Sequence, residues 1–177
     1  MCLTFKLSCL LAKILKIDLL CTPITSFFTI KFEGKSVSEY TDFNKRLSSN
    51  EANKNELNII NAVIKEIGER GALPRYFTRD EKNAYALPPK QEKYFIQSDD
   101  YGIRLYCVVL NEQIVFLVNG DRKKTQKATD PVSNGGKYFY MANSLHEELI
   151  KDKLNKIINW RDNDLEIDDD YLVNIKG

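Results

Sequence analysis

Apolar residues recur at helical spacing in two stretches of the first half of the chain. The first stretch opens with a capping-box pattern, Ser36 with Glu39, and predicts a helix over 36–47. Its apolar positions are Tyr40, Phe43 and Leu47. The second stretch predicts a helix with the apolar stripe Leu57, Ile60, Ile64 and Ile67. Gly68 or Gly71 can end this second helix, so we expect the two helices to form a hairpin.

Runs of aromatic and β-branched residues predict strands on both sides of this hairpin. The predicted strands are 26–32, which precedes the hairpin, and three later runs at 93–98, 103–110 and 113–119. Tight turns join the three later runs, which forces them into an antiparallel meander. Alternation along the middle run places Arg104 and Tyr106 on the face opposite to Ile103 and Leu105.

A long helical pattern from 138 to 160 follows, and the tail 165–177 is expected to form a short strand or to lie partly loose. The segment 72–90 is punctuated by prolines and predicts an irregular connection. These elements predict an α+β fold. In it, an N-terminal strand and a helical hairpin pack on an antiparallel β-meander, and a long C-terminal helix follows.

Residues 1–22 fit no targeting class. Lys13, Lys16 and Asp18 interrupt the apolar run, so it lacks the hydrophobic stretch of a signal peptide and is too charged to span a bilayer. Three interpretations remain: an amphipathic helix packed on the domain, a surface-seeking segment, or a translated stretch upstream of the true start. We predict an extension at 1–22 that need not belong to the core. A single domain is predicted over 23–177, with an acidic tail at 161–177.

The composition is that of an ordinary globular protein. Of 177 residues, 43% are hydrophobic and 29% are charged, which suits a single core. The net charge of +1 hides an uneven distribution, because 119–127 carries four cations against one Asp and 160–170 carries six acids against one Arg. Any affinity for nucleic acid must therefore come from local clusters of charge.

The cysteines and the single histidine, His146, form no metal-ligand pattern. Cys2, Cys9, Cys21 and Cys107 contain no CxxC pair. A structural zinc site needs four Cys or His ligands brought together, so no metal and no cofactor are expected. Three of the four cysteines lie in the first 21 residues, which argues against a disulfide framework and for a reducing cytoplasm.

The basic run after the last predicted strand is the main candidate for function. It consists of Arg122, Lys123, Lys124 and Lys127. Such a cluster is either a solvated loop or a phosphate-binding surface. Its position directly after an apolar strand, with Arg104 one strand earlier, favours phosphate binding.

Three motifs follow one another within 103–127. Arg104-Leu105-Tyr106 lies on one strand, the next strand reads IVFLVNG, and a Lys-Lys-Thr-x-Lys run begins at Lys123. In these motifs, and in the order of elements over 26–160, the chain resembles the RelE/ParE-like toxin superfamily of type II toxin–antitoxin modules, in its HigB-like, phage-derived branch. The chain departs from that branch where members often carry His-Gly-Phe, because it has Val118-Asn119-Gly120-Asp121.

The resemblance implies a cytoplasmic RelE-like toxin that inhibits translation by ribosome-dependent mRNA cleavage. The chemistry would be a metal-independent attack of the 2′-OH on the adjacent phosphate. Catalytic roles are implied for Arg104, Lys123 and Lys124. RNA-binding roles are implied for Tyr106, Arg122, Lys127 and Tyr138. Tyr106, or an aromatic such as Tyr138 or Tyr140, would stack on an unpaired base. The implied partners are mRNA on the ribosome and a cognate antitoxin protein with a DNA-binding helix-turn-helix, with no membrane and no cofactor.

The missing histidine keeps a second interpretation open. In it, the protein is a non-catalytic module with the toxin fold, of phage or mobile-element origin, that binds RNA, DNA or a protein partner through the same basic surface. A third interpretation follows the ParE branch, whose toxins inhibit gyrase without cutting RNA.

Overall fold

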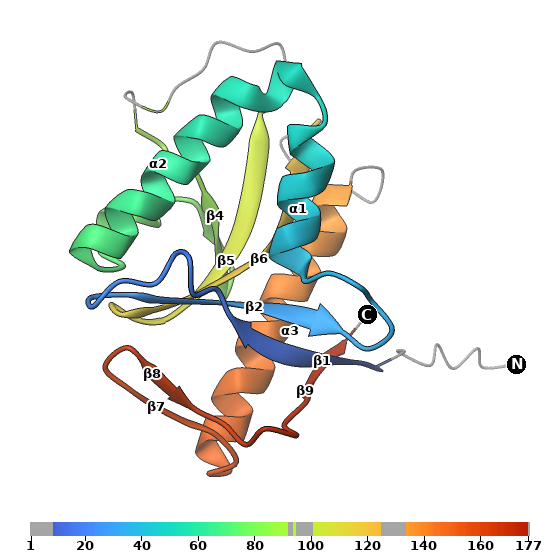
Figure 1. Ribbon diagram of the computed structural model, residues 1–177, viewed down its shortest axis with the longest axis vertical. Helices are drawn as coiled ribbons and strands as arrows, with labels where there is room; N and C mark the ends of the chain where they lie inside the picture. The colour runs from blue at the N-terminus through green and yellow to red at the C-terminus, as the bar shows by residue number, and fades with distance from the viewer. Residues whose placement is uncertain (1–8, 92–93, 95–100, 125–133, 177) are drawn as a thin grey trace, which may run out of the picture.

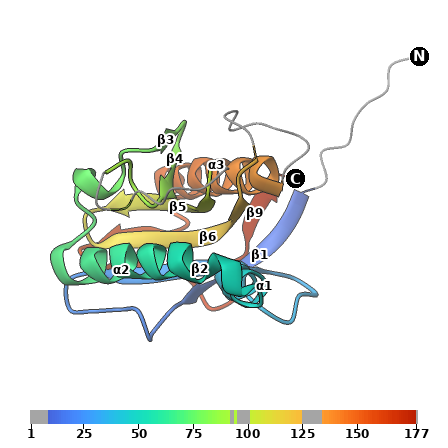
Figure 2. The same ribbon diagram turned by 90° about the horizontal axis from the view of Figure 1, so that it is seen from above.

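A mixed β-sheet lies between two layers of helices, α1 and α2 on one face and α3 on the other (Figures 1 and 2). The structure, a computed structural model, describes residues 9–91, 94, 101–124 and 134–176. Within these residues, seven strands form one sheet in the order β3-β4-β5-β6-β2-β1-β9, and β7 and β8 form a separate hairpin. The α+β class predicted from the sequence is confirmed.

The elements in chain order are β1 (Cys9–Lys16), β2 (Ser26–Phe32), α1 (Glu39–Ser48), α2 (Lys54–Arg70), β3 (Asp80–Glu81), β4 (Ala84–Leu87), β5 (Ile103–Asn111), β6 (Ile114–Arg122), α3 (Asn134–Leu154), β7 (Asn159–Arg161), β8 (Asp164–Glu166) and β9 (Val173–Lys176). Single 3₁₀ turns at Glu51–Asn53 and Pro74–Tyr76 flank α2.

The centre of the sheet is an antiparallel meander of β4, β5 and β6. β2 joins it by parallel pairing with β6, so the sheet is mixed and not purely antiparallel. Its first strand, β4, comes from 72–90, and the prediction of an irregular connection was wrong there. The short run AYAL gave little strand signal, yet Ala84, Ala86 and Leu87 are fully buried. The strand predicted at 93–98 lies outside the described residues except for Tyr94.

α1 and α2 form the predicted hairpin, and their apolar stripes are buried against the sheet. The predicted start of α1 was wrong, because Ser38 and not Ser36 is the N-cap. Its Oγ accepts a hydrogen bond from Thr41 N at 3.3 Å. α2 ends at Arg70 and is capped by Gly71, whose φ of +87° favours glycine.

Residues 9–16 form β1, an interior strand that pairs with β2 on one side and β9 on the other. Ala12 and Ile14 belong to the core, whereas the side chain of Lys13 between them is exposed. The prediction that 1–22 need not belong to the core was therefore wrong for this strand, and so was the amphipathic helix. Buried and exposed side chains alternate along β1, as expected for a strand. The lysines at the exposed positions hid this pattern in the sequence.

The last helix, α3, begins at Asn134 and ends at Leu154, not at 138 and 160 as predicted. A Schellman-type turn closes it, in which Ile157 N donates to Asp152 O at 2.9 Å and Lys156 adopts a φ of +60°. α3 is not the C-terminal element, because β9 follows it and pairs with β1. The tail therefore does form a strand, at the end of the sheet.

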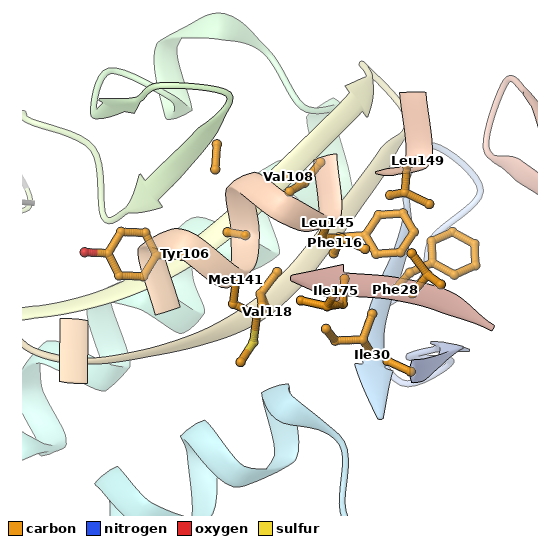
Figure 3. Close-up of a cluster of buried hydrophobic side chains, with 14 of the residues drawn as sticks. Phe28, Ile30, Tyr106, Val108, Phe116, Val118, Met141, Leu145, Leu149 and Ile175 are labelled. Atoms are coloured by element: carbon orange, nitrogen blue, oxygen red, sulfur yellow. The ribbon is translucent and has the colours of Figure 1, made fainter. Parts of the chain in front are cut away.

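Two apolar clusters fill the two sides of the sheet. The cluster under α3 includes Phe28 and Phe116 (Figure 3), and the cluster under α1 and α2 includes Phe27. β5 contributes Tyr106 to the first cluster and Leu105 to the second, as alternation predicted. Because both faces of β5 and β6 are covered by helices, side chains that act on a ligand have to come from the ends of these strands.

Candidate nucleic-acid interface

One end of the sheet gathers most of the residues that the sequence singled out. There α1 ends, α2 and α3 begin, β5 begins and β6 ends (top of Figure 1). Arg104 on β5 lies opposite Asp121 on β6. Pairing continues past the strands, because Lys123 N donates to Gly102 O at 2.9 Å. Arg104 and Lys123 are therefore held on paired backbone, close to one another.

Arg122 points away from this pair, toward α2. Its Nη2 lies 2.6 Å from Glu56 Oε1 and donates to Asn53 Oδ1 at 2.8 Å. Only 26% of the Arg122 side chain is exposed. The RNA-binding role predicted for Arg122 is therefore corrected to a structural one, since its guanidinium is committed to a carboxylate of the same chain.

The backbones of β5 and β6 approach each other closely beside Arg104. A Cβ added to Gly120 would lie 1.8 Å from Arg104 O, a distance that no side chain can occupy. The register between the strands shifts here, between Leu105 and Cys107. This irregularity lies next to the paired residues Arg104 and Asp121. The close approach of the two backbones requires glycine at position 120.

The two tyrosines predicted to stack on RNA bases are both buried. Tyr106, labelled in Figure 3, is 1% exposed. It packs edge-on against Phe139, with ring centroids 6.3 Å apart. Tyr138 is 6% exposed. The guanidinium carbon of Arg46 lies over the Tyr138 ring, 5.6 Å from the ring centroid. Burial raises the pKa of Tyr138 above its usual value. Neither ring offers a face to solvent, so the prediction that Tyr106 and Tyr138 stack on RNA bases was wrong.

Arg46 on α1 is the centre of a polar network that the sequence analysis missed. Its Nη2 donates to Gly120 O at 2.6 Å and to Asn119 Oδ1 at 3.1 Å, and its Nη1 lies 3.2 Å from Asp121 Oδ1. Asn119 is fully buried and donates to Glu39 Oε2 at 2.6 Å. β2 pairs with β6 only as far as Phe116. Past that residue, Arg46 donates the hydrogen bond to Gly120 O on the edge of β6 that β2 no longer covers.

Two signals in the sequence pointed to this network. Asn119 interrupts an otherwise apolar strand, and Glu39, Asp42 and Arg46 repeat at helical spacing on α1. A polar residue inside a buried strand requires a hydrogen-bond partner, and a polar stripe on a helix that faces the sheet supplies it.

Several lysines reach solvent at this end, beside exposed polar residues where α1 ends and α2 begins, among them Ser49, Asn50 and Glu51. Lys123 is half-buried and Lys124 is exposed after β6, Lys137 is exposed in the first turns of α3, and Lys45 is exposed near the end of α1. Lys127 lies outside the described residues. These lysines come from separate elements at one end of the sheet, and lysine is a residue that contacts the phosphates of a nucleic-acid backbone.

No metal ligand set accompanies these lysines. Among the residues that the structure describes, no three His, Cys, Asp or Glu side chains come close enough together to hold a metal ion. In that same part of the chain, no helix is long and apolar enough to cross a bilayer.

Comparison with known proteins adds no relative. No protein-family model matches the chain, no curated protein sequence matches it, and no solved structure matches it. The candidate interface therefore rests on its residues and their contacts.

Proposed function

We propose that this protein is a translation-inhibiting toxin with a RelE-like fold, which binds mRNA on the ribosome and cleaves it. The observation that carries the proposal is the placement of Arg104 and Lys123 on paired backbone at one end of the sheet, with Lys124 exposed beside them. Cations on a β-ladder keep a fixed spacing, which transition-state stabilisation requires and a solvated loop does not provide.

The connectivity of the central elements supports the proposal. β2, α1 and α2 precede the meander β4-β5-β6, and this order is the one on which the resemblance to RelE-like toxins rests. α3 then covers the face of the meander opposite to the hairpin. β1, β9 and the β7–β8 hairpin are additions around this centre.

The proposed reaction uses only the RNA and the cations of the site. The 2′-oxygen attacks the adjacent phosphorus, the bond from phosphorus to the 5′-oxygen breaks, and a 2′,3′-cyclic phosphate remains. Arg104 holds the phosphate and offsets its growing negative charge. One lysine of the pair Lys123 and Lys124 takes the 2′-OH proton, and the other protonates the leaving 5′-oxygen.

A translation inhibitor of this kind would stop the growth of its own host. The proposal therefore includes a cognate antitoxin protein that silences it. Induction of the chain alone is expected to arrest growth, and co-expression of the antitoxin is expected to relieve the arrest.

A second candidate function is RNA binding without cleavage. The burial of Tyr106 and Tyr138, and the engagement of Arg122 with Glu56, favour it, because they remove three of the seven residues implied to act on RNA. A binding module of this kind would show a steep dependence of affinity on salt, since phosphate contacts release counterions.

Primer extension on mRNA in cell-free translation, with and without ribosomes, separates these candidates. The variants are Arg104→Ala and Lys123→Ala, and the control is Lys65→Ala, an exposed lysine on α2 away from the site. New ends that appear only on translated message, and that vanish in the two site variants but not in the control, would support the nuclease. RNA or ribosome binding without new ends would support the second candidate.

A further inference from the structure

Tyr140 is the exposed end of a row of three aromatic rings that starts in the core. Tyr106 packs edge-on against Phe139, and Phe139 packs edge-on against Tyr140 with centroids 5.2 Å apart and an interplanar angle of 76°. Exposure rises along the row, from 1% at Tyr106 through 7% at Phe139 to 57% at Tyr140. The contact with Phe139 therefore holds the Tyr140 ring in place while much of its surface stays in solvent.

A basic and a polar residue lie within one helical turn of Tyr140 along α3. Lys137 lies one helical turn before Tyr140 and is exposed, with its Nζ 5.5 Å from the neighbouring Tyr138 ring. On the other side, Asn143 Oδ1 accepts a hydrogen bond from Asn83 N at 2.7 Å, which fixes the β3–β4 turn beside the helix. Lys82 in that turn places its Nζ 3.4 Å from Glu147 Oε1.

We infer that Tyr140 is a base-stacking site for single-stranded RNA, with Lys137 as its phosphate contact. This inference rests on the RNA binding proposed above and replaces Tyr106 and Tyr138 in the stacking role. A rise of about 1.5 Å per residue separates the α-carbons of Lys137 and Tyr140 by about 5 Å along the helix. That spacing lets one nucleotide place its base on the ring while an adjoining phosphate reaches the lysine.

The surroundings of Tyr140 favour a nucleobase over an apolar protein partner. Tyr140 lies three residues after Lys137 and three before Asn143 on α3. Among the described residues of α3, the other exposed large apolar side chain, Leu154, lies at the far end of the helix. One aromatic face beside a cation is the arrangement that single-strand binding proteins use for sequence-tolerant stacking.

Fluorescence titration of the full chain with a short labelled single-stranded RNA tests the inference, with Tyr140→Ala and Tyr140→Phe as variants. Removing one base–aromatic stack is expected to weaken binding about 5- to 150-fold. Tyr140→Phe should bind like the original chain, and an RNA with abasic positions should make Tyr140→Ala and the original chain alike. Leu154→Ala, an exposed apolar change on the same helix, should have no effect.

Salt dependence separates the roles of the two residues. Lys137→Ala should lower the slope of log affinity against log salt by about 0.7, the value for one phosphate contact on a single strand. Tyr140→Ala should leave that slope unchanged. Circular dichroism melting of each variant shows whether a loss of binding reflects a loss of fold.

Unchanged RNA affinity in a folded Tyr140→Ala variant would overturn the inference and leave the proposed function standing. A loss of RNA affinity in Tyr101→Ala, with none in Tyr140→Ala, would also overturn the inference. Tyr101 is the other exposed tyrosine near the site, and its N donates a hydrogen bond to Lys123 O. If the original chain binds neither RNA nor ribosomes, the proposed function fails as well, and that result is distinct from the first two.

Discussion

Arg122 at the end of β6 and Glu56 in the first turn of α2 lie 2.6 Å apart, from Nη2 to Oε1. The second oxygen of the same carboxylate accepts a hydrogen bond from Ile103 N, also at 2.6 Å. One carboxylate therefore ties α2 to both strands that carry the candidate site. An added Cβ at Gly102 would lie 2.6 Å from Glu56 Oε2, so the glycine makes room for this contact. The positions of Arg104 and Lys123 depend on it.

Arg122→Gln is expected to lower the free energy of unfolding by about 2 kcal/mol. The change leaves the Glu56 carboxylate, which is only 12% exposed, without its ionic partner, and the residual exposure of the pair keeps the loss below that of a fully buried one. Urea denaturation measures it. The matched control is Lys54→Ala, which breaks an exposed pair with Glu51 and should change stability by less than about 1 kcal/mol. Equal losses in both variants would contradict the structural role of Arg122.

Gly120→Ala is expected to destabilise the fold by about 3 kcal/mol or more. Its Cβ would meet Arg104 O at 1.8 Å, so β5 and β6 would have to separate at the site. Gly34→Ala is the comparison, since nothing lies within 4 Å of its added Cβ and only its φ of +77° opposes the change. That variant should lose only about 1 kcal/mol. Thermal melting of the two variants would contradict the close approach if they lost equal stability.

The regular elements were predictable because their patterns are periodic and local. The stripe from Leu57 to Ile67 on α2 and the alternation around Leu105 on β5 are both present as expected. Errors arose where the determining contact is distant or lacks a residue signature. The turn that closes α3 after Leu154 contains Lys156, a lysine in the left-handed region where glycine is the usual marker. β4 is too short for its pattern to stand out, and it is fixed by pairing with β5.

The candidate site was predictable only in part, for the same physical reason. The sequence placed Arg104 and Lys123 near each other through the β5–β6 hairpin, which is a local constraint. It did not show that Arg122 turns toward Glu56, because that contact joins residues far apart in the chain. Tyr106 was misassigned because alternation gives the face of a strand but not whether a helix covers that face. α3 covers it here.

Asn119→Ala is expected to lower the free energy of unfolding by about 1–3 kcal/mol. Asn119 donates to Glu39 Oε2 at 2.6 Å in the interior, and its loss leaves a buried carboxylate with one donor fewer. Glu39→Gln in the Asn119→Ala background should restore part of this loss, because a neutral amide is less costly to bury than a carboxylate. A double-mutant cycle by urea denaturation measures the coupling, and strictly additive losses would contradict it.

Cys107 and Cys9 are expected to differ sharply in reactivity toward iodoacetamide. The Cys107 side chain is fully buried, and burial raises the pKa of its thiol far above the usual value, so almost no reactive thiolate forms even in alkaline buffer. Cys9 on β1 is exposed. Mass spectrometry of the alkylated native protein should find Cys9 modified and Cys107 intact, and urea should make both react. Modification of native Cys107 at a rate like that of Cys9 would contradict the packing of β5.

Truncation after Trp160 is expected to unfold the protein or destabilise it by several kcal/mol. The acidic residues of the tail lie beyond Leu154, about 30 Å along α3 from its beginning near the lysines, so they do not cover the candidate site. The tail instead supplies β9, whose Val173 and Ile175 are buried beside β1. Each such side chain contributes about 1.5–3 kcal/mol.

A variant that changes only charge separates the effect of the acidic residues of the tail from the effect of its strand β9. Replacing Asp168, Asp169 and Asp170, which are all exposed, by asparagine removes the charge and keeps β9. RNA affinity and the urea midpoint should both stay close to those of the original chain, whereas the truncated chain should lose the cooperative unfolding transition. A gain in RNA affinity on charge removal would mean that the acidic segment competes with phosphate at the lysines, and it would contradict the separation of the two ends of α3.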